Sequence, residues 1–202
     1  KTLRHEAKKR HLSTAVILFE PQPAEYFLGQ DAPARIYLLR EKITYLSELG
    51  IDYVICLSFD EKMAMMSATD FSNHLLFKQL HVKYLITGED FHFGYQRQGN
   101  YKTLCAQAQI YNVEVDCFNN YLTDNQRVSS TRIRQALQLG KFSLAEKLLG
   151  RAYAISGRVI HGAKRGRQWG IPTANLKLTH MRVPLKGVYD VWVLRGKERY
   201  AA

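Results

Sequence analysis

The stretch best equipped for chemistry is residues 127–134, which reads Arg-Val-Ser-Ser-Thr-Arg-Ile-Arg. Ser129 or Ser130 can cap a helix there, because a serine oxygen accepts a hydrogen bond from an N–H group of the first turn. The N–H groups left over and the positive end of the helix dipole favour a bound anion. Thr131 offers a further hydroxyl, and Arg134, one turn after Ser130, can add a forked contact to a polyphosphate. The stretch therefore predicts a phosphate site. An ordinary capped helix with a solvated basic face is the open alternative.

A second candidate is the loop at residues 88–94, Gly-Glu-Asp-Phe-His-Phe-Gly, which comes after an apolar stretch that predicts a strand ending at Thr87. Open α/β sheets bind ligands at the carboxyl ends of their strands. Phe91 and Phe93 can stack on a planar ring, and Asp90 can orient a phosphate or a metal ion. The loop therefore predicts a ligand site, although a purely structural loop would look similar. Residues 19–23, Phe-Glu-Pro-Gln-Pro, end another predicted strand in the same way, because proline stops the strand and stiffens the loop after it.

The third candidate is the basic stretch at residues 157–176, which holds four glycines and four lysines or arginines. Such a loop can surround phosphate with backbone N–H groups and cationic side chains together. Thr173 and Asn175 are two residues apart, so in an extended segment their oxygens lie on one side. Hard oxygen ligands of this kind suit a phosphate-bound Mg²⁺. A solvated hairpin, or a basic arm for nucleic acid, is the alternative.

Composition excludes several other classes of site. The seven histidines have no ligand spacing and the three cysteines no Cys-x-x-Cys pattern, so we expect neither a zinc site nor a disulfide framework. This cysteine usage predicts a reducing, cytoplasmic location. No apolar run approaches the ~18 residues of a membrane span, so we expect no membrane association.

The net charge of +11 is unevenly distributed. Residues 1–126 hold 13 Lys and Arg against 15 Asp and Glu, whereas residues 127–202 hold 16 against 3. The composition therefore changes near the Ser-Ser-Thr stretch, which predicts a boundary and a strongly anionic ligand after it. Polyphosphate and nucleic acid would both fit.

Hydrophobic patterning predicts the elements that must position these residues. Helical patterns alternate with short apolar strands through the first two thirds of the chain, which is typical of a parallel sheet covered by helices on both faces. The expected strands are residues 14–19, 51–57, 82–87 and 113–118, and the expected helices are residues 2–11, 35–49, 67–80 and 101–108. The strand at 14–19 is continuously apolar and is expected to be buried on both faces. A helix from Ser130 and one at 143–149, capped by Gly150, come next, and β-type stretches occupy 154–160 and 188–194.

With these segments in order, the chain resembles the bacterial bifunctional riboflavin kinase/FMN adenylyltransferases, often called FAD synthetases. Residues 19–23, 88–94 and 128–134 are similar to motifs of the adenylyltransferase half of that family. Residues 149–153 are similar to its junction, and residues 161–167, 170–176 and 187–189 to its kinase half. The resemblance implies a Rossmann-like α/β nucleotidyltransferase domain at 1–140, a linker helix at 141–152, and the N-terminal part of a β-barrel riboflavin kinase domain at 153–202.

The resemblance also implies chemistry and roles. ATP would phosphorylate riboflavin to FMN and then adenylylate FMN to FAD, with release of pyrophosphate and with Mg²⁺ as the metal. The partners would be small-molecule nucleotides and flavins, without nucleic acid or membrane, and the resemblance leaves the oligomeric state open. FMN would be bound by Phe19, Glu20, Pro21, Pro23, Asp90, Phe91 and Phe93. The phosphates of ATP would be held by Ser130, Thr131 and Arg134 in the first half, and by Gly162, Lys164, Arg165, Gly166, Arg167, Gly170 and Tyr189 in the kinase half. Thr173 and Asn175 would hold the metal.

The sequence departs from the family pattern in three places. The histidine-containing phosphate loop of the family precedes residue 1, with the first strand of the sheet, and the kinase glutamate lies beyond residue 202. We therefore identify no catalytic residue within these 202 residues, and expect a chain cut at both ends with at most weak activity. Gln22 stands where the family often has histidine. The competing hypotheses are a basic nucleic-acid-binding module and a nucleotidyltransferase for another phosphorylated cofactor precursor.

Overall fold

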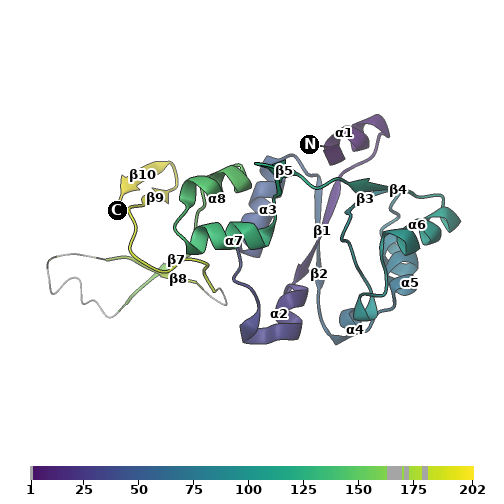
Figure 1. The fold of residues 1–202 in the computed structure, drawn as a ribbon, viewed down its shortest axis with the longest axis horizontal. Coiled ribbons are helices and arrows are strands. Elements are labelled where there is room, and N and C mark those ends of the chain that lie inside the picture. Colours follow the sequence, from purple (N-terminus) through teal and green to yellow (C-terminus); the bar gives the residue numbers. More distant parts are fainter. Residues whose placement is uncertain (1, 163–169, 171–172, 179–181) are drawn as a thin grey trace. The chain divides into compact units, whose positions relative to one another are not determined.

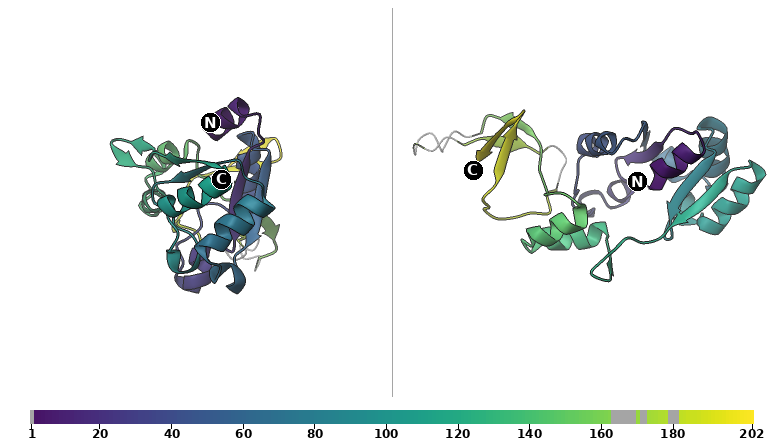
Figure 2. Two further views of the ribbon diagram at one scale, coloured as in Figure 1. Left: turned by 90° about the vertical axis from the view of Figure 1, so that its right-hand side faces the viewer. Right: turned by 90° about the horizontal axis from the view of Figure 1, so that it is seen from above.

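The computed structural model describes residues 2–162, 170, 173–178 and 182–202. The chain divides into two compact units. The first contains Lys1–Pro33 and Tyr37–Val128, and the second contains Ala34–Ile36 and Ser129–Ala202. Figures 1 and 2 show the elements of both units from three sides. The predicted boundaries, at 140, 152 and 202, stay a prediction.

The first unit alternates strands and helices, as its sequence pattern predicts. Its elements are α1 (Thr2–Lys9), β1 (Ala15–Glu20), α2 (Pro23–Leu28), the 3-10 turn η1 (Gly29–Asp31), α3 (Leu39–Glu48), β2 (Tyr53–Ser58), α4 (Glu61–Ala64), α5 (Ala68–Asp70), the π-helix η2 (Phe71–Gln79), β3 (Tyr84–Gly88), the 3-10 turn η3 (Tyr95–Arg97), α6 (Tyr101–Ile110), β4 (Glu114–Phe118), β5 (Leu122–Thr123) and β6 (Gln126–Arg127). α2 lies where we expected a loop, and α4 and the β5–β6 hairpin lie in stretches for which the sequence pattern predicted no element.

The strands pair in parallel, as expected. β1 pairs with β2 from Ala15 opposite Tyr53 to Glu20 opposite Ser58, and β3 pairs with β4 from Tyr84 opposite Glu114 to Gly88 opposite Phe118. Within the described part of the chain these are two separate two-stranded pairs and not one continuous sheet. The expectation that the strand at 14–19 is buried on both faces was wrong. Most of β1 is half-buried, because it has a hydrogen-bonded neighbour on only one side.

The core of the first unit forms around the π-helix. Its buried members are Phe71, Leu75, Leu76, Phe77, Phe93, Leu104, Ala108 and Val113. Partly buried residues from all four strands pack against this cluster, including Ile17, Leu57, Leu85 and Val115. Both parallel pairs therefore contact one core, and Figure 1 shows α5 and α6 beside the β3–β4 pair.

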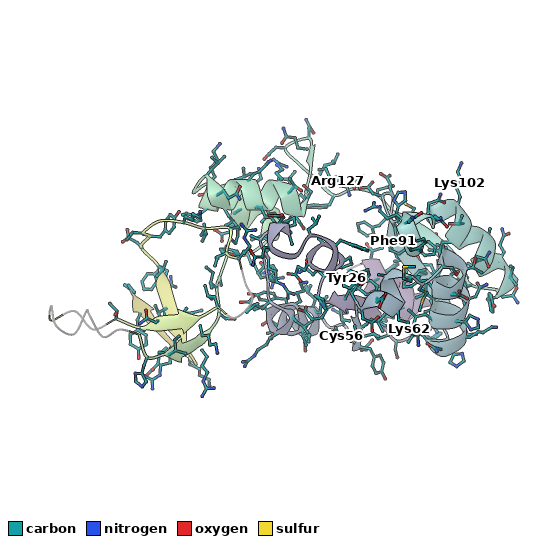
Figure 3. The ribbon with its side chains drawn as sticks, turned by 90° about the horizontal axis from the view of Figure 1, so that it is seen from below. Tyr26, Cys56, Lys62, Phe91, Lys102 and Arg127 are labelled. Carbon is teal, nitrogen blue, oxygen red and sulfur yellow. The ribbon has the colours of Figure 1, made fainter. Side chains whose placement is uncertain are left out.

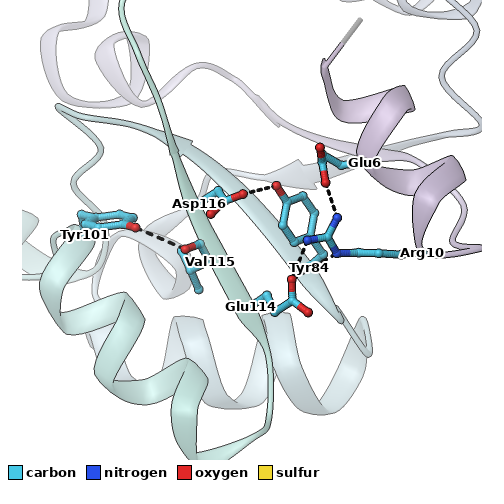
Figure 4. A network of polar contacts seen from close by, with 7 residues as sticks. All are labelled: Glu6, Arg10, Tyr84, Tyr101, Glu114, Val115 and Asp116. Carbon is cyan, nitrogen blue, oxygen red and sulfur yellow. Dashed lines mark hydrogen bonds and ion pairs between the residues drawn. The ribbon is translucent and has the colours of Figure 1, made fainter.

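A polar network fastens α1 to the β3–β4 pair (Figure 4). Arg10, just after α1, pairs with Glu6 and with Glu114, the latter at 2.6 Å, and its guanidinium lies 3.9 Å from the ring centroid of Tyr84. The Tyr84 hydroxyl donates to Asp116. Burial, and then the hydrogen bond to Asp116, raise the pKa of Tyr84 to about 12. The phenol therefore stays protonated as a donor across the physiological range.

The second unit joins two helices to two β-ribbons. α7 (Ser130–Gln138) and α8 (Phe142–Leu149) precede the antiparallel pairs β7 (Arg158–Ile160) with β8 (Asn175–Lys177) and β9 (Trp192–Arg195) with β10 (Glu198–Ala201). The predicted left-handed cap at Gly150 is confirmed, with φ of 71°. The described residues form no closed barrel. The strands are shorter than the predicted stretches at 154–160 and 188–194, and all their residues are exposed.

Candidate functional site

A row of aromatic rings joins two of the predicted motifs in the first unit. Phe19, near the end of β1, meets Phe59 edge-on at 5.6 Å and Phe71 at 6.4 Å between ring centroids. Phe71 lies 5.5 Å from Phe93, which stacks on Phe91 at 5.3 Å with 17° between the ring planes. The structure therefore brings the 19–23 and 88–94 motifs together, although the two are far apart in the sequence.

The rings in this row differ in how much surface they offer a ligand. Phe93 is 7% exposed and belongs to the core, whereas Phe19 and Phe91 are half-buried. At the other end of the row, Tyr26 and Phe27 of α2 are 40% and 65% exposed, and both meet the Phe59 ring. Figure 3 labels Tyr26 and Phe91. A planar apolar ligand can thus contact Phe19, Phe91 or the α2 rings, while Phe93 supports Phe91 from behind.

The sequence interpretation missed the α2 and Phe59 rings. It takes Pro21 and Pro23 to end a strand and to stiffen a loop after it, yet Pro23 is the first residue of α2. Proline is common at the first position of a helix, where its missing N–H costs nothing. That signal could have placed Tyr26 and Phe27 on a helix directly after β1. The Glu20–Pro21 peptide bond is cis, and Glu20 lies opposite Ser58 at the ends of β1 and β2.

The loop at residues 88–94 is held from its far end by close backbone packing. Phe93 and Gly99 exchange two backbone hydrogen bonds, at 3.1 and 2.9 Å. Gly94 has φ of +74°, and a Cβ there would lie 2.5 Å from the backbone nitrogen of Ala68. The positive φ and the close approach to Ala68 both require glycine at 94. The loop is therefore anchored on α5 and the core, which leaves its first half to face solvent.

The two acids of this loop contact the segment that leads into α7. The Asp90 carboxylate pairs with the Arg127 guanidinium, and Glu89 accepts a hydrogen bond of 2.7 Å from the Asn120 amide. Burial raises the pKa of the nearby Cys117 thiol, and the negative charges of Glu89 and Asp90 add to that increase. The sequence places Arg127 with the phosphate helix, so its contact with Asp90 is not foreseen.

The predicted phosphate helix is present in the second unit as α7. Ser129 is the cap, because its side chain accepts a hydrogen bond of 3.3 Å from the Arg132 N–H. Ser130 and Thr131 are exposed in the first turn. The predicted buried face is confirmed, and it consists of Ile133, Ala136 and Leu137.

Arg134 lies on the same helix, and part of its guanidinium is hydrogen-bonded to the backbone of another segment. Its Nε donates to the Ala34 carbonyl at 2.6 Å, and burial lowers the pKa of its guanidinium. The predicted helix at 35–49 begins only at Leu39, and Ala34–Ile36 before it belongs to the second unit. The Nη groups of Arg134 remain the donors that could reach a phosphate.

Two predicted kinase residues meet on the β7–β8 ribbon. Asn175 lies opposite Ile160, and a Cβ on Gly162 would lie 2.2 Å from Asn175 Nδ2, so the amide packs directly on this glycine. Thr173 and Asn175 are both exposed. Lys164, Arg165, Gly166 and Arg167 lie outside the described residues.

The last two kinase positions are also described. Gly170 has φ of +73°, in the left-handed region. The Tyr189 hydroxyl donates to the Lys186 carbonyl at 2.7 Å, and its ring meets Phe142 of α8 edge-on at 5.1 Å. Within the described part of the chain, no group of three histidines, cysteines or acids could hold a metal ion.

Comparison with family models gives two matches in sequence order. The model described as FAD synthetase matches residues 1–132, and the model described as riboflavin kinase matches residues 149–202. Residues 133–148 lie between the two matches, and the first match ends close to the change in charge and to the boundary of the two units after Val128.

Similar proteins extend over nearly the whole chain. Bifunctional riboflavin kinase/FMN adenylyltransferases from Escherichia coli K12 and Haemophilus influenzae are 46% and 48% identical over 95% of it. The chain spans 61% and 62% of the length of these relatives. A crystal structure described as a macrolide-efflux protein from Streptococcus pneumoniae is 30% identical with a TM-score of 0.81, over 98% of this chain and 64% of that one. None of the helices described here has the length and apolar character needed to cross a membrane.

Proposed function

The chain belongs to the FAD synthetase family, and on this premise we propose that it is part of an enzyme that makes both flavin cofactors. Its first part adenylylates FMN with ATP to give FAD and pyrophosphate, and its second part belongs to a kinase that converts riboflavin to FMN. The observation that carries this proposal is that one chain matches the FAD synthetase and riboflavin kinase models in succession. The enzyme works in the cytoplasm on nucleotides and flavins, without nucleic acid.

The aromatic row supports a flavin site in the first unit. Isoalloxazine is planar and largely apolar, so it stacks on exposed aromatic rings. The FMN-binding residues are Phe19, Glu20, Pro21, Pro23, Asp90, Phe91 and Phe93. Phe19 and Phe91 contact the ring system, while buried Phe93 fixes Phe91 in position.

The α7 helix supports a site for the ATP phosphates at Ser130, Thr131 and Arg134. In the reaction an FMN phosphate oxygen attacks the α-phosphorus of ATP, and the bond from that phosphorus to the bridging oxygen of pyrophosphate breaks. Such transfers depend on positioning and on stabilising charge on the phosphate oxygens more than on covalent help from the protein. The hydroxyls and the guanidinium supply those donors, and the histidine loop of the family supplies further ones.

The β7–β8 ribbon supports the nucleotide site of the kinase. Thr173 and Asn175 offer neutral oxygens of the kind that Mg²⁺ accepts alongside ATP phosphates. Magnesium neutralises charge on the transferred phosphoryl group when bound. The Asn175 amide is held on Gly162 and therefore has a defined position. Gly170, Tyr189 and the basic residues at 164–167 complete the phosphate contacts.

The same proposal accounts for the open edges of both units. Among the described residues each parallel pair of the first unit has two strands and is therefore open at its edges, and both pairs pack on one core. A further strand between β1 and β3 would make them a single Rossmann-like sheet. The exposed β-ribbons of the second unit are the first strands of the kinase barrel. We propose domains at 1–140, 141–152 and 153–202.

One incubation tests the proposal. The full-length protein is mixed with riboflavin and Mg-ATP, and the flavins are separated by chromatography at successive times. We expect FMN to appear first and FAD to form after it. If neither flavin forms, the proposal is wrong. Adenylylation of a different phosphorylated precursor would favour a related nucleotidyltransferase, and salt-sensitive binding of DNA or RNA without competition by flavins would favour a nucleic-acid-binding module.

A further inference from the structure

The loop at residues 88–94 carries two adjacent acids, Glu89 and Asp90, whose side chains have partners of different charge. Glu89 is met by the neutral Asn120 amide at 2.7 Å, which satisfies an oxygen but leaves the charge. Asp90 is met by the Arg127 guanidinium, which satisfies an oxygen and also cancels the charge. Arg127 is therefore the group that sets the charge at the solvent-facing edge of this loop.

This ion pair contributes little to folding. The side chains of Arg127 and Asp90 are 49% and 58% exposed, and exposed ion pairs stabilise proteins weakly. The loop is already anchored by the buried Phe93 and by the close packing of Gly94 and Gly99 on Ala68. The effect of the pair is thus mainly electrostatic.

The charge matters because the proposed substrate is anionic. A free carboxylate beside Phe91, where the flavin ring stacks, would repel the phosphate of FMN. A cation paired with a carboxylate offsets its charge, so the repulsion felt by an anion that approaches the pair is weaker than that of a lone carboxylate. The arrangement thus places a compensating cation where the loop would otherwise oppose its ligand.

We propose that Arg127 is a positioning residue for FMN adenylylation, acting through Asp90. Its guanidinium neutralises the Asp90 carboxylate and holds it against β6, so that the FMN phosphate can approach the loop. This inference rests on the proposed function of the same site. In this proposal Arg127 acts through its contact with Asp90 and not through a contact of its own with the flavin.

The test is a double-mutant cycle on FAD formation by the full-length protein, with FMN varied and Mg-ATP saturating. We expect Arg127→Ala to raise KM for FMN roughly fivefold with little change in kcat, the size expected for one exposed charge interaction. The change should shrink as salt is added. In the double variant Asp90→Asn with Arg127→Ala, the increase in KM should be smaller than the sum of the two single effects, because the Asp90 charge that Arg127 neutralises is gone.

Lys102→Ala is the matched control, since it removes one exposed positive charge from α6 and should leave KM unchanged; Figure 3 labels Lys102 and Arg127. Thermal melting of each variant checks folding. A KM for Arg127→Ala equal to wild type would overturn the inference. So would additive defects in the double variant, which would indicate that Arg127 only orders the chain. Both of these outcomes leave the proposed function intact, whereas a wild-type enzyme that makes no FAD from FMN would overturn the proposed function and the inference together.

Discussion

At the scale of single residues, Arg134 has to serve two roles. Its Nε is bound to the Ala34 carbonyl, so only its Nη groups can reach a phosphate. The contact with Ala34 orients the guanidinium before ATP arrives, which lowers the entropy cost of binding. A side chain held in this way is better suited to a fixed forked contact than a mobile lysine would be.

We expect Arg134→Ala to weaken ATP use in FAD formation and to spare FMN formation. Losing a charge-assisted phosphate contact costs about 1.5–3 kcal/mol, equivalent to roughly 10- to 150-fold in kcat/KM for ATP. Arg134→Lys should recover only part of the loss, because it keeps the charge but not the fork. Lys141→Ala, an exposed change just before α8, is the control. Equal loss of both activities in a folded variant would contradict the assignment.

Asp52 provides a pH-dependent contribution to stability. Its carboxylate accepts hydrogen bonds from the N–H and hydroxyl of Thr14, at 2.8 and 2.7 Å, and these bonds lower its pKa below the ordinary value of 3.8. A carboxylate whose pKa is lower when folded stabilises the protein at pH values above the unfolded pKa. That stability is lost as the pH falls through the folded pKa.

We therefore expect wild type to be more stable than Asp52→Asn at neutral pH, with the difference shrinking once the pH falls below 3.8. Asparagine keeps an acceptor for Thr14 but carries no charge. Urea unfolding at a series of pH values measures the difference directly. A constant difference across the series would show that the charge of Asp52 contributes nothing.

The site residues of α7 could be predicted because their pattern lies within one short stretch of sequence. The cap, the hydroxyls and the buried face of α7 can be read from spacing within one helix. The Asp90–Arg127 pair joins residues 37 apart, and the Phe19–Phe71 contact joins two separate elements. Neither is encoded in a local pattern, because each depends on how the elements pack.

At the scale of elements, the sequence predicted whether a segment is a helix or a strand better than it predicted helix geometry or strand burial. The helical pattern at 67–80 is present, but most of it is the π-helix Phe71–Gln79. The buried residues of this π-helix, Phe71, Ser72, Leu75, Leu76 and Phe77, include spacings of one and four that an α-helix also gives, so apolar spacing over nine residues does not separate the two. β1 and β2 lie close to their predicted bounds. The predicted burial of β1 on both faces was wrong, because burial depends on neighbours far away in the chain.

Two glycines near the 88–94 loop allow a matched test of how it is anchored. A Cβ at Gly99 would lie 2.8 Å from the Phe93 ring and 2.9 Å from Ala68 Cβ, whereas a Cβ at Gly88 would meet nothing within 4 Å. We expect Gly99→Ala to lower the free energy of unfolding by about 1–3 kcal/mol, as overpacking in a core does. Gly88→Ala should change it by less than about 0.5 kcal/mol. Chemical denaturation measures both, and equal effects would mean that the packing on Ala68 is not limiting.

At the scale of the whole molecule, three features divide the chain between about residues 127 and 149. They are the change in charge, the change from alternating strands and helices to β-ribbons, and the two family matches. The compact units separate between Val128 and Ser129, a few residues before the FAD synthetase match ends. The segment Ala34–Ile36 joins the second unit despite its place in the sequence. No pattern in the sequence predicts this, because the contact of Ala34 with Arg134 spans 100 residues.

The division predicts that the two activities can be lost separately. We expect Asn175→Ala to reduce FMN formation from riboflavin by about tenfold or more, because even indirect supports of a metal site commonly contribute about 10- to 100-fold. FAD formation from supplied FMN should persist, since Asn175 lies in the kinase segment. Lys177→Ala is the control, because Lys177 is exposed two residues along the same strand, on the same side of β8.

Raising the Mg²⁺ concentration should restore part of the FMN formation lost in Asn175→Ala, because a weakened metal site fills again at higher metal concentration. Full FMN formation at low Mg²⁺ would rule out the metal-binding role, and parallel loss of FAD formation would show that the two segments do not act independently.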